Sequence, residues 1–148
     1  MIFICVLTQV LSLPQECQSY QELSEQDRAQ GYKLSGSPKC DNLLGKAWYR
    51  FTGDAGDKIA DKLVARNQCG THAPGYLTGG HPTVGQGAVS RKVCFHWSSN
   101  SCQWSINIRV RNCGAFYVYE LSKPPACSLR YCGNGGGGRK TKESNKLK

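Results

Sequence analysis

The sequence predicts a small, disulfide-rich domain that is mostly β, with an antiparallel meander, long irregular loops and at most a short N-terminal helix. Three observations lead to this class. The 148 residues include nine cysteines, the clearest periodicity is the two-residue alternation of a strand, and glycine or proline interrupts most other segments. A chain of this length allows one domain and hardly two.

The strand signal is clearest between Cys102 and Cys113, where apolar and polar residues alternate strictly in the string QWSINIRVRN. Such alternation is typical of a half-buried strand. We predict strands at about 88–97, 102–111 and 115–122, joined by short connections as in a meander. Arg109 and Arg111 then face solvent as ordinary strand residues.

Other segments give weaker signals. Ser19 followed by Glu22 fits a helix capping box, so we expect a short helix there, ended by Gly31. Residues 48–51 (WYRF) are aromatic and β-prone. The segment from Gly70 to Gly87 is crowded with Gly, Pro and His, and is predicted to be a structured but irregular loop.

The first residues resemble a secretory signal peptide. The stretch MIFICVLTQVLSL is mostly apolar and uncharged, and a cut after Ser12 would assign 1–12 to the signal. No basic residue precedes the apolar run, so a buried N-terminal strand or a truncated gene model are the alternatives. No stretch reaches the ~18–20 apolar residues of a spanning helix. We expect a secreted, extracellular protein without a transmembrane span.

Removal of the signal would also remove Cys5 and leave an even number of cysteines. Eight cysteines can form four disulfides, which small secreted domains use to compensate for a limited core. Their spacing leaves 105 pairings open, and Cys127 and Cys132 could pair with each other or with distant partners. The predicted disulfide cysteines are Cys17, Cys40, Cys69, Cys94, Cys102, Cys113, Cys127 and Cys132.

Motifs for enzymatic or metal chemistry are absent from the sequence. It contains no G-x-S-x-G, H-E-x-x-H, P-loop or C-x-x-C string. A zinc site using Cys94 and His96, or a hydrolase using a histidine, are the alternatives we keep open. We expect no enzymatic activity, no metal, no cofactor and no nucleic-acid partner.

After Cys132 the composition changes. The run from Gly133 to Gly138 reads as a flexible linker, and residues 139–148 carry five basic residues and one acidic residue. This +4 segment supplies nearly half of the formal net charge of +9. It predicts a disordered basic tail, so 133–148 is linker and tail. The alternative function is a secreted factor that binds polyanions or surfaces through this tail.

Several strings together resemble one known family. They are CDNLLGKAWYRFTGDAGDK (40–58), CGTHAPGYL (69–77), HP (81–82), VCFHWSSNSCQW (93–104), CGAFYVYEL (113–121) and PPACSLRYC (124–132). Their order and spacing resemble the cysteine-rich domain of the uromodulin family, over about 17–132.

The resemblance implies a secreted or cell-surface module that binds a protein or glycan partner. The family's domain accompanies EGF-like and zona pellucida modules, so the chain could also be a fragment of such a protein. Family members act as decoys for bacterial adhesins through N-glycans, which makes a microbial adhesin a candidate partner. Two positions that often carry sequons in the family lack Asn here. Asn100 lies only in the rare N-x-C form.

Within this module we expect the partner to contact exposed residues of the glycine-rich loop. The candidate binding residues are His72, Pro74, Tyr76 and His81. The alternative is that these residues only give the loop its shape. Trp48, Trp97 and Trp104 are expected in the core.

Two cysteines of the family pattern are absent. The resemblance places them at Leu63 and Ser101, which implies that one disulfide is lost as a pair and that the other eight cysteines stay bridged.

We predict that the double variant Leu63→Cys/Ser101→Cys forms a fifth bridge, because both positions would then regain their family partner. Mass-spectrometric disulfide mapping of the folded variant checks this. Two free thiols at 63 and 101, or free thiols among the eight native cysteines, would contradict it.

Overall fold

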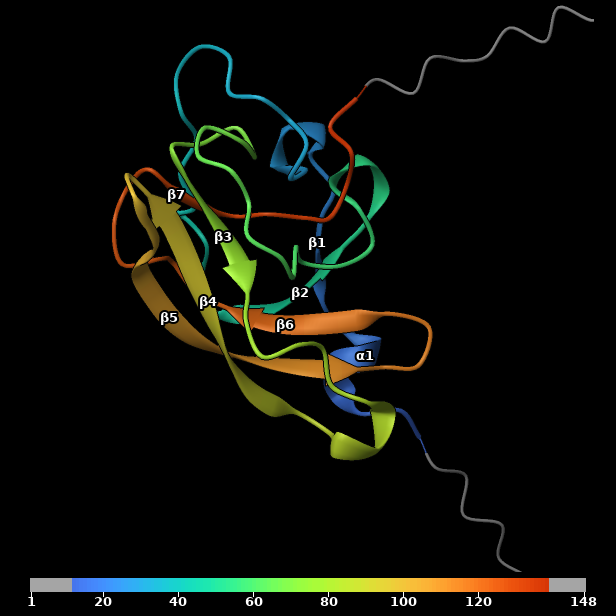
Figure 1. Ribbon diagram of the computed structural model, residues 1–148. Helices are drawn as coiled ribbons and strands as arrows, with labels where there is room; N and C mark the ends of the chain where they lie inside the picture. Colours follow the sequence, from blue (N-terminus) through green and yellow to red (C-terminus); the bar gives the residue numbers. More distant parts are fainter. Residues whose placement is uncertain (1–11, 139–148) are drawn as a thin grey trace, which may run out of the picture.

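The computed structural model describes residues 12–138 (Figure 1). Within this range the strands form one seven-stranded sheet with the order β1-β2-β6-β5-β4-β3-β7. The helical elements are α1 (Gln15–Gln18) and the 3-10 turns η1 (Gln26–Arg28), η2 (Gly53–Ala55) and η3 (Val84–Gln86). The strands are β1 (Gln21–Leu23), β2 (Ala47–Phe51), β3 (Ala73–Leu77), β4 (Val89–Trp97), β5 (Asn100–Asn112), β6 (Tyr117–Leu121) and β7 (Leu129–Tyr131).

The predicted meander is confirmed as β4, β5 and β6, which are adjacent and antiparallel. Two long curved ribbons, β4 and β5, dominate the sheet in Figure 1. The predicted alternation along β5 is also present, because Ile108 and Val110 are buried whereas Asn107 and Arg109 are exposed. Arg111 is only half-buried and forms an ion pair with Glu16, 2.6 Å away.

The expectation of an irregular loop from Gly70 to Gly87 is wrong for its first half. Residues 73–77 form β3, which lies inside the sheet between β4 and β7. Glycine and proline disfavour strands in general. Here Gly75 is needed, because a Cβ at this position would lie 2.6 Å from the Phe95 ring. Close packing against that ring therefore overrides the local signal.

The predicted capping box is also wrong. The helix α1 ends before Ser19, which has extended dihedral angles, and the chain then enters β1. Leu23 pairs with Phe51 in the parallel β1–β2 ladder and is 4% exposed. Burial of this leucine in the core outweighs the weak helix signal around it.

The main core lies on one face of the sheet. Its largest fully buried side chains include Tyr119, Tyr131, Phe51 and Phe95. Trp97 and Trp104 pack against this core while half-buried. Trp48 is also half-buried, but it lies under the Arg109 guanidinium, 5.2 Å from ring centroid to Cζ, and its expected place in the core is wrong.

A smaller cluster around Val64, Tyr76 and the Cys94–Cys102 bridge forms a second packed region. The Tyr76 hydroxyl donates to the Ser101 carbonyl at 2.7 Å, and Leu63, 55% exposed, precedes Val64. The two positions that lack the family cysteines therefore border the same cluster.

The eight cysteines of the described range form four disulfides. Three of them join distant parts of the chain, with sequence separations of 96, 87 and 63 residues. Such bridges restrict the unfolded chain most strongly. The pairs are Cys17–Cys113, Cys40–Cys127, Cys69–Cys132 and Cys94–Cys102.

The flexible linker predicted to begin at Gly133 is wrong for residues 133–135. The Gly133 amide donates to Arg28 at 3.0 Å, and the Gly135 amide donates to Ala55 at 3.0 Å. The Asn134 side-chain oxygen accepts from the amide of Asp57 at 2.9 Å, and its amide donates to the Asp57 carboxylate at 2.8 Å. Small residues are required here, because a Cβ at Gly133 would collide with the Ala55 carbonyl. The predicted signal segment up to residue 11 and the basic tail from 139 lie outside the described residues.

No helix among residues 12–138 has the length and apolar character needed to cross a membrane.

We predict that Asn134→Ala lowers the free energy of unfolding by about 1 kcal/mol, because the backbone amides of Asp57 and Lys58 lose their common acceptor. Urea denaturation measures the change. Asn42→Ala is the matched control, since Asn42 is exposed, and it should change stability by less than about 0.5 kcal/mol. Equal effects of the two substitutions would show that the Asn134 side chain does not stabilise the domain.

Candidate functional site

The structure separates the four candidate binding residues. Pro74 and Tyr76 are buried in β3, so their expected exposure is wrong. His72 is half-buried, and its ring lies 5.4 Å from that of Trp97. His81 packs against Tyr117, and Tyr117 lines a surface pocket.

His81 takes part in a compact polar cluster. Its Nε2 atom lies 2.7 Å from the Tyr119 hydroxyl, which itself accepts a hydrogen bond from the Ile59 amide at 3.0 Å. The other ring nitrogen, Nδ1, is buried and lies 3.4 Å from the Asp61 carboxylate. The His81 ring also packs on Tyr117, with centroids 4.3 Å apart.

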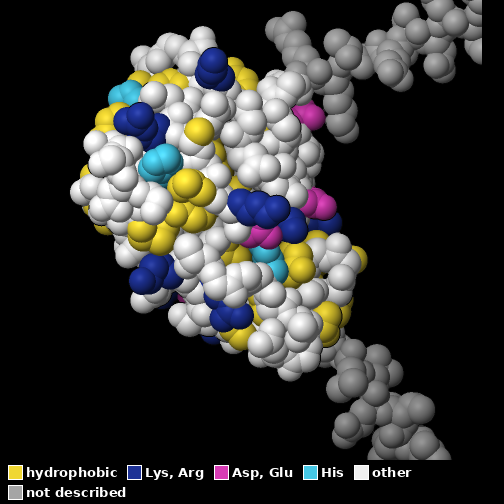
Figure 2. Space-filling view, in the orientation of Figure 1, with side chains coloured by type: hydrophobic (Ala, Val, Ile, Leu, Met, Phe, Trp, Pro, Cys, Tyr) yellow, Lys and Arg dark blue, Asp and Glu magenta, His cyan; other side chains and the backbone are white. Residues whose placement is uncertain are grey.

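The surroundings favour a neutral His81. Burial is the largest influence and lowers its pKa, the Asp61 carboxylate acts in the opposite direction, and Lys58 and Arg91 add to the lowering. The net pKa is below the ordinary value. Burial likewise raises the pKa of Tyr119 far above its usual range, so this phenol stays protonated. Figure 2 shows histidine, acidic and basic side chains side by side on this face.

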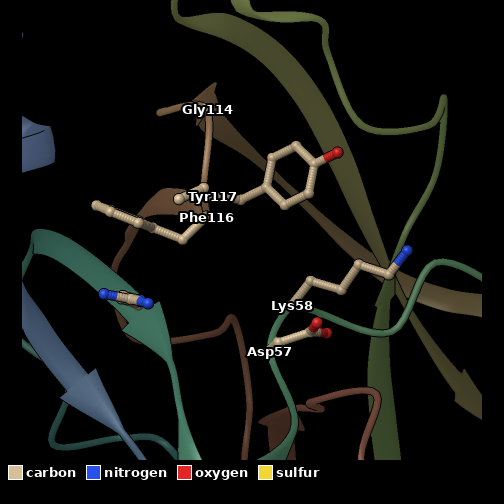
Figure 3. Close-up of a pocket in the computed structure, with 7 residues that line it drawn as sticks. Asp57, Lys58, Gly114, Phe116 and Tyr117 are labelled. Carbon is tan, nitrogen blue, oxygen red and sulfur yellow. The ribbon is translucent and has the colours of Figure 1, made fainter.

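Next to Tyr117 a pocket of about 110 Å³ opens between the β5–β6 turn and residues 57–58 (Figure 3). We name it the Arg50 pocket. In Figure 3 the Tyr117 ring and the Lys58 side chain lie on one side, and Phe116 lies on the other. Its lining residues are Arg50, Asp57, Lys58, Gly114, Ala115, Phe116 and Tyr117.

Arg50 is held in place by aromatic rings. Its guanidinium carbon lies 3.9 Å from the centroid of Phe116, and one Nη donates to the Tyr20 hydroxyl at 2.9 Å. The strand β2 directs Arg50 away from the main core, since Tyr49 and Phe51 on either side are buried in it. Sequence reasoning missed this residue, because WYRF indicated only an aromatic, β-prone segment and nothing local marked Arg50 as part of a site.

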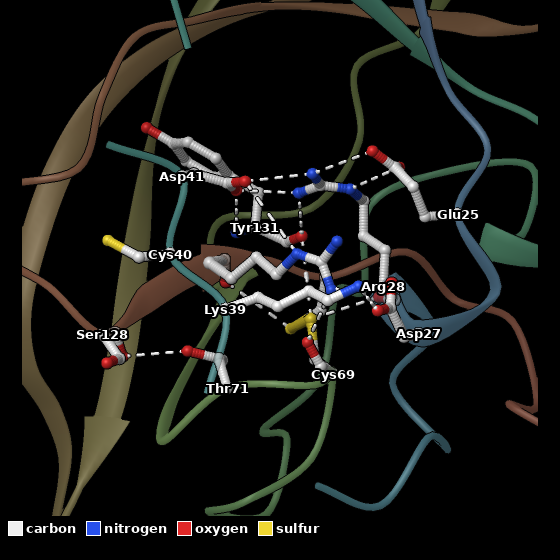
Figure 4. A network of polar contacts seen from close by, with 12 residues as sticks. Glu25, Asp27, Arg28, Lys39, Cys40, Asp41, Cys69, Thr71, Ser128 and Tyr131 are labelled. Carbon is white, nitrogen blue, oxygen red and sulfur yellow. Dashed lines mark hydrogen bonds and ion pairs between the residues drawn. A yellow bond between two sulfur atoms is a disulfide. The ribbon is translucent and has the colours of Figure 1, made fainter. Parts of the chain in front are cut away.

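A second group of charges is buried elsewhere and is fully paired (Figure 4). Arg28, 3% exposed, donates two hydrogen bonds to Asp41, at 2.7 and 3.0 Å, and a third to the Tyr131 carbonyl at 3.1 Å. Asp41 also accepts from the Tyr131 amide at 2.9 Å. We name Arg28, Asp41 and these Tyr131 contacts the buried ion pair.

Two neighbouring residues extend this arrangement. Arg130 bonds to Asp27 at 3.0 Å, and Lys39 also contacts Asp27. Burial alone would raise the pKa of Asp27, but these cations hold it below its ordinary value. Because every charge here has a partner inside the domain, the arrangement is suited to stabilising the fold and leaves little charge for a ligand.

The described residues do not support the zinc alternative. Cys94 is bridged to Cys102, and His96 Nδ1 lies 2.8 Å from the Val64 carbonyl. Across residues 12–138 no group of three His, Cys, Asp or Glu side chains could hold a metal ion.

Together, the sheet, the disulfides and the pocket define a disulfide-stapled β domain with a small surface pocket. A family model described as a uromodulin-like domain matches residues 49–133, and the chain belongs to this family.

Individual relatives support the assignment. Uromodulin of Mus musculus is 44% identical over 117 residues, which cover 78% of this chain and 18% of the relative. The pancreatic secretory granule membrane major glycoprotein GP2 of Canis lupus familiaris is 44% identical over 117 residues, or 78% of this chain and 23% of the relative. The Homo sapiens protein of the same name is 41% identical over 118 residues, covering 78% and 21%. The chain thus spans about a fifth of the length of these relatives.

We predict that His81 makes stability depend on pH between neutral and mildly acidic conditions. Its folded pKa is lowered, so the unfolded chain takes up a proton first as pH falls below ~6.5. The contribution is fully present above that pH and is lost as pH falls toward the folded pKa, with a slope of at most ~1.4 kcal/mol per pH unit. Urea denaturation from pH 8.5 to 5 should show a smaller slope for His81→Gln below pH 6.5. Above pH 7.5 the two curves should run parallel, and equal slopes throughout would contradict the prediction.

Proposed function

We propose that this chain is a secreted module that binds an extracellular protein or glycan partner through the face that carries the Arg50 pocket. The observation that carries the proposal is the pocket itself. It combines an aromatic wall with the cations of Arg50 and Lys58 and the carboxylate of Asp57. Binding sites for small groups are typically concave, with apolar walls and a few converging polar atoms.

The disulfides support an extracellular location. Bridges persist in oxidising compartments and are rare in the cytosol. Here four of them hold the described part of the chain. The name of the GP2 relatives, a secretory granule membrane glycoprotein, agrees with a protein of the secretory route.

The contacts of the three histidines argue against a catalytic role. His81 meets the phenol of Tyr119, His96 meets a backbone carbonyl, and His72 packs on an indole ring. A nucleophile needs a base within hydrogen-bond reach, and Tyr119 is fully buried. We therefore propose a role without chemical turnover.

The four residues that the sequence indicates as binding candidates have different places in this proposal. The His81 ring is proposed to hold the Tyr117 ring, which lines the Arg50 pocket, in place. Pro74 and Tyr76 are proposed to shape β3 and its packing. His72 is proposed as a peripheral contact.

We predict that Ala115→Gln weakens partner binding at least about tenfold, because a longer side chain at the exposed rim obstructs the pocket without removing a native contact. The full chain, labelled and purified from a secreting host, is measured on a mixed glycan array and against surface proteins of associated bacteria. Ser99→Gln, in the exposed β4–β5 turn, is the matched control and should bind as the unaltered chain does.

Equal binding by the unaltered chain and Ala115→Gln would contradict the proposed face. Loss of binding after removal of 139–148 would instead assign it to the basic tail.

A further inference from the structure

Arg50 is a half-buried cation without an anionic partner among the described residues. It takes part in none of the ion pairs there, whereas Arg28, Arg109, Arg111 and Arg130 all do. Arg91 is also half-buried and outside these ion pairs, but its guanidinium donates to the carbonyls of Gly80 and Ser90, at 2.9 and 3.0 Å. Partly buried charges are normally paired, because removing them from water is costly. The lack of an anionic partner therefore makes Arg50 a candidate for contact with an anionic ligand.

The guanidinium is fixed in advance of any ligand. The Phe116 ring lies against one face, at 3.9 Å, and the Tyr20 ring lies 5.6 Å from the guanidinium carbon. Only the Tyr20 hydroxyl accepts a hydrogen bond from it in the described part of the chain, and the Nε atom is buried with no acceptor. A guanidinium has five donors in a planar fork that matches a carboxylate. With one Nη hydrogen bonded to Tyr20 and Nε buried, up to three Nη hydrogens remain for a ligand.

The rest of the Arg50 pocket suits a sugar. Lys58 adds a second cation, although it also lies 3.5 Å from Asp61. Asp57 provides an acceptor for hydroxyl groups, and Phe116 and Tyr117 provide flat apolar surface for the C–H face of a ring. The volume of about 110 Å³ is sufficient for part of one sugar residue.

We infer that the Arg50 pocket binds the carboxylate of an acidic sugar residue at the end of a glycan, with the Arg50 guanidinium as its main partner. This inference rests on the proposed binding function and names its ligand class. The carboxylate supplies the missing counter-charge, and charge-assisted pairs of this kind are the stronger hydrogen bonds. The hydroxyl groups of the sugar contact Asp57 and Lys58.

The test uses the full chain and defined probes. Sialyllactose and a glucuronic-acid disaccharide are compared with lactose, and acetate stands for the free carboxylate. Isothermal titration measures each dissociation constant. The acidic sugars should bind at least about tenfold more tightly than lactose, and acetate alone should bind more weakly than either acidic sugar.

Two charge-matched variants locate the site. Arg50→Gln should weaken binding of the acidic sugars at least about tenfold and leave the weak binding of lactose unchanged, because only the carboxylate contact is removed. Lys92→Gln removes the same charge from an exposed position on β4 and should leave both unchanged. Circular dichroism and the melting temperature establish that each variant is folded. If Arg50→Gln does not fold, Arg50→Lys keeps the charge but loses the fork, and it should weaken binding to a smaller extent.

Equal affinity for lactose and the acidic sugars, or equal losses in Arg50→Gln and Lys92→Gln, would overturn the inference. Acetate binding as tightly as the sugars would overturn the sugar as ligand class. If the glycan array shows a partner whose binding depends on Ala115 but not on a carboxylate, the proposed function stands and only this inference fails.

Discussion

The buried ion pair between Arg28 and Asp41 is the interaction on which the rest of the structure depends. Both side chains are almost fully buried, and each also bonds to the backbone of Tyr131 in β7. Removing one partner of a buried ion pair lowers the free energy of unfolding by about 3–5 kcal/mol, so each of the two residues requires the other. The pair attaches the N-terminal segment and the loop before β2 to one strand at the end of the sheet.

A covalent bridge and further polar contacts also lie around this strand, β7. The Cys69–Cys132 bridge and the Arg130–Asp27 contact lie around the same strand, and the Cys132 amide that follows it donates to Gly75 of β3. The Cys17–Cys113 bridge joins α1 to the residue that follows β5, the central strand of the sheet. The turn that begins at Gly114 follows this bridge directly and presents Phe116 to Arg50. The pocket thus sits on a turn whose base is covalently fixed.

The meander could be predicted because its signal is local. Alternation along β5 shows which residues face the core, and short turns show that the neighbours are antiparallel. By contrast, β3 reads as a loop because Pro74 and Gly75 disfavour strands locally, whereas the packing of Gly75 against the Phe95 ring and the pairing with β7 involve distant residues. The same holds for the candidate site. His81 was identified by its residue type and its loop, whereas Arg50 gains its significance from Tyr20 and Phe116, residues far from it in the chain.

The sequence by itself determined the class of the domain: its cysteine content, its alternating strands and the ordered strings of one family all follow from neighbouring residues. Only the tertiary structure decided which cysteines pair, which charges form ion pairs and which have no charged partner among the described residues. The physical reason is that pairing energies depend on distance and burial between segments. Asp41 neutralises Arg28 while Arg50 has no such partner in the described chain, and nothing local in the sequence distinguishes these two arginines.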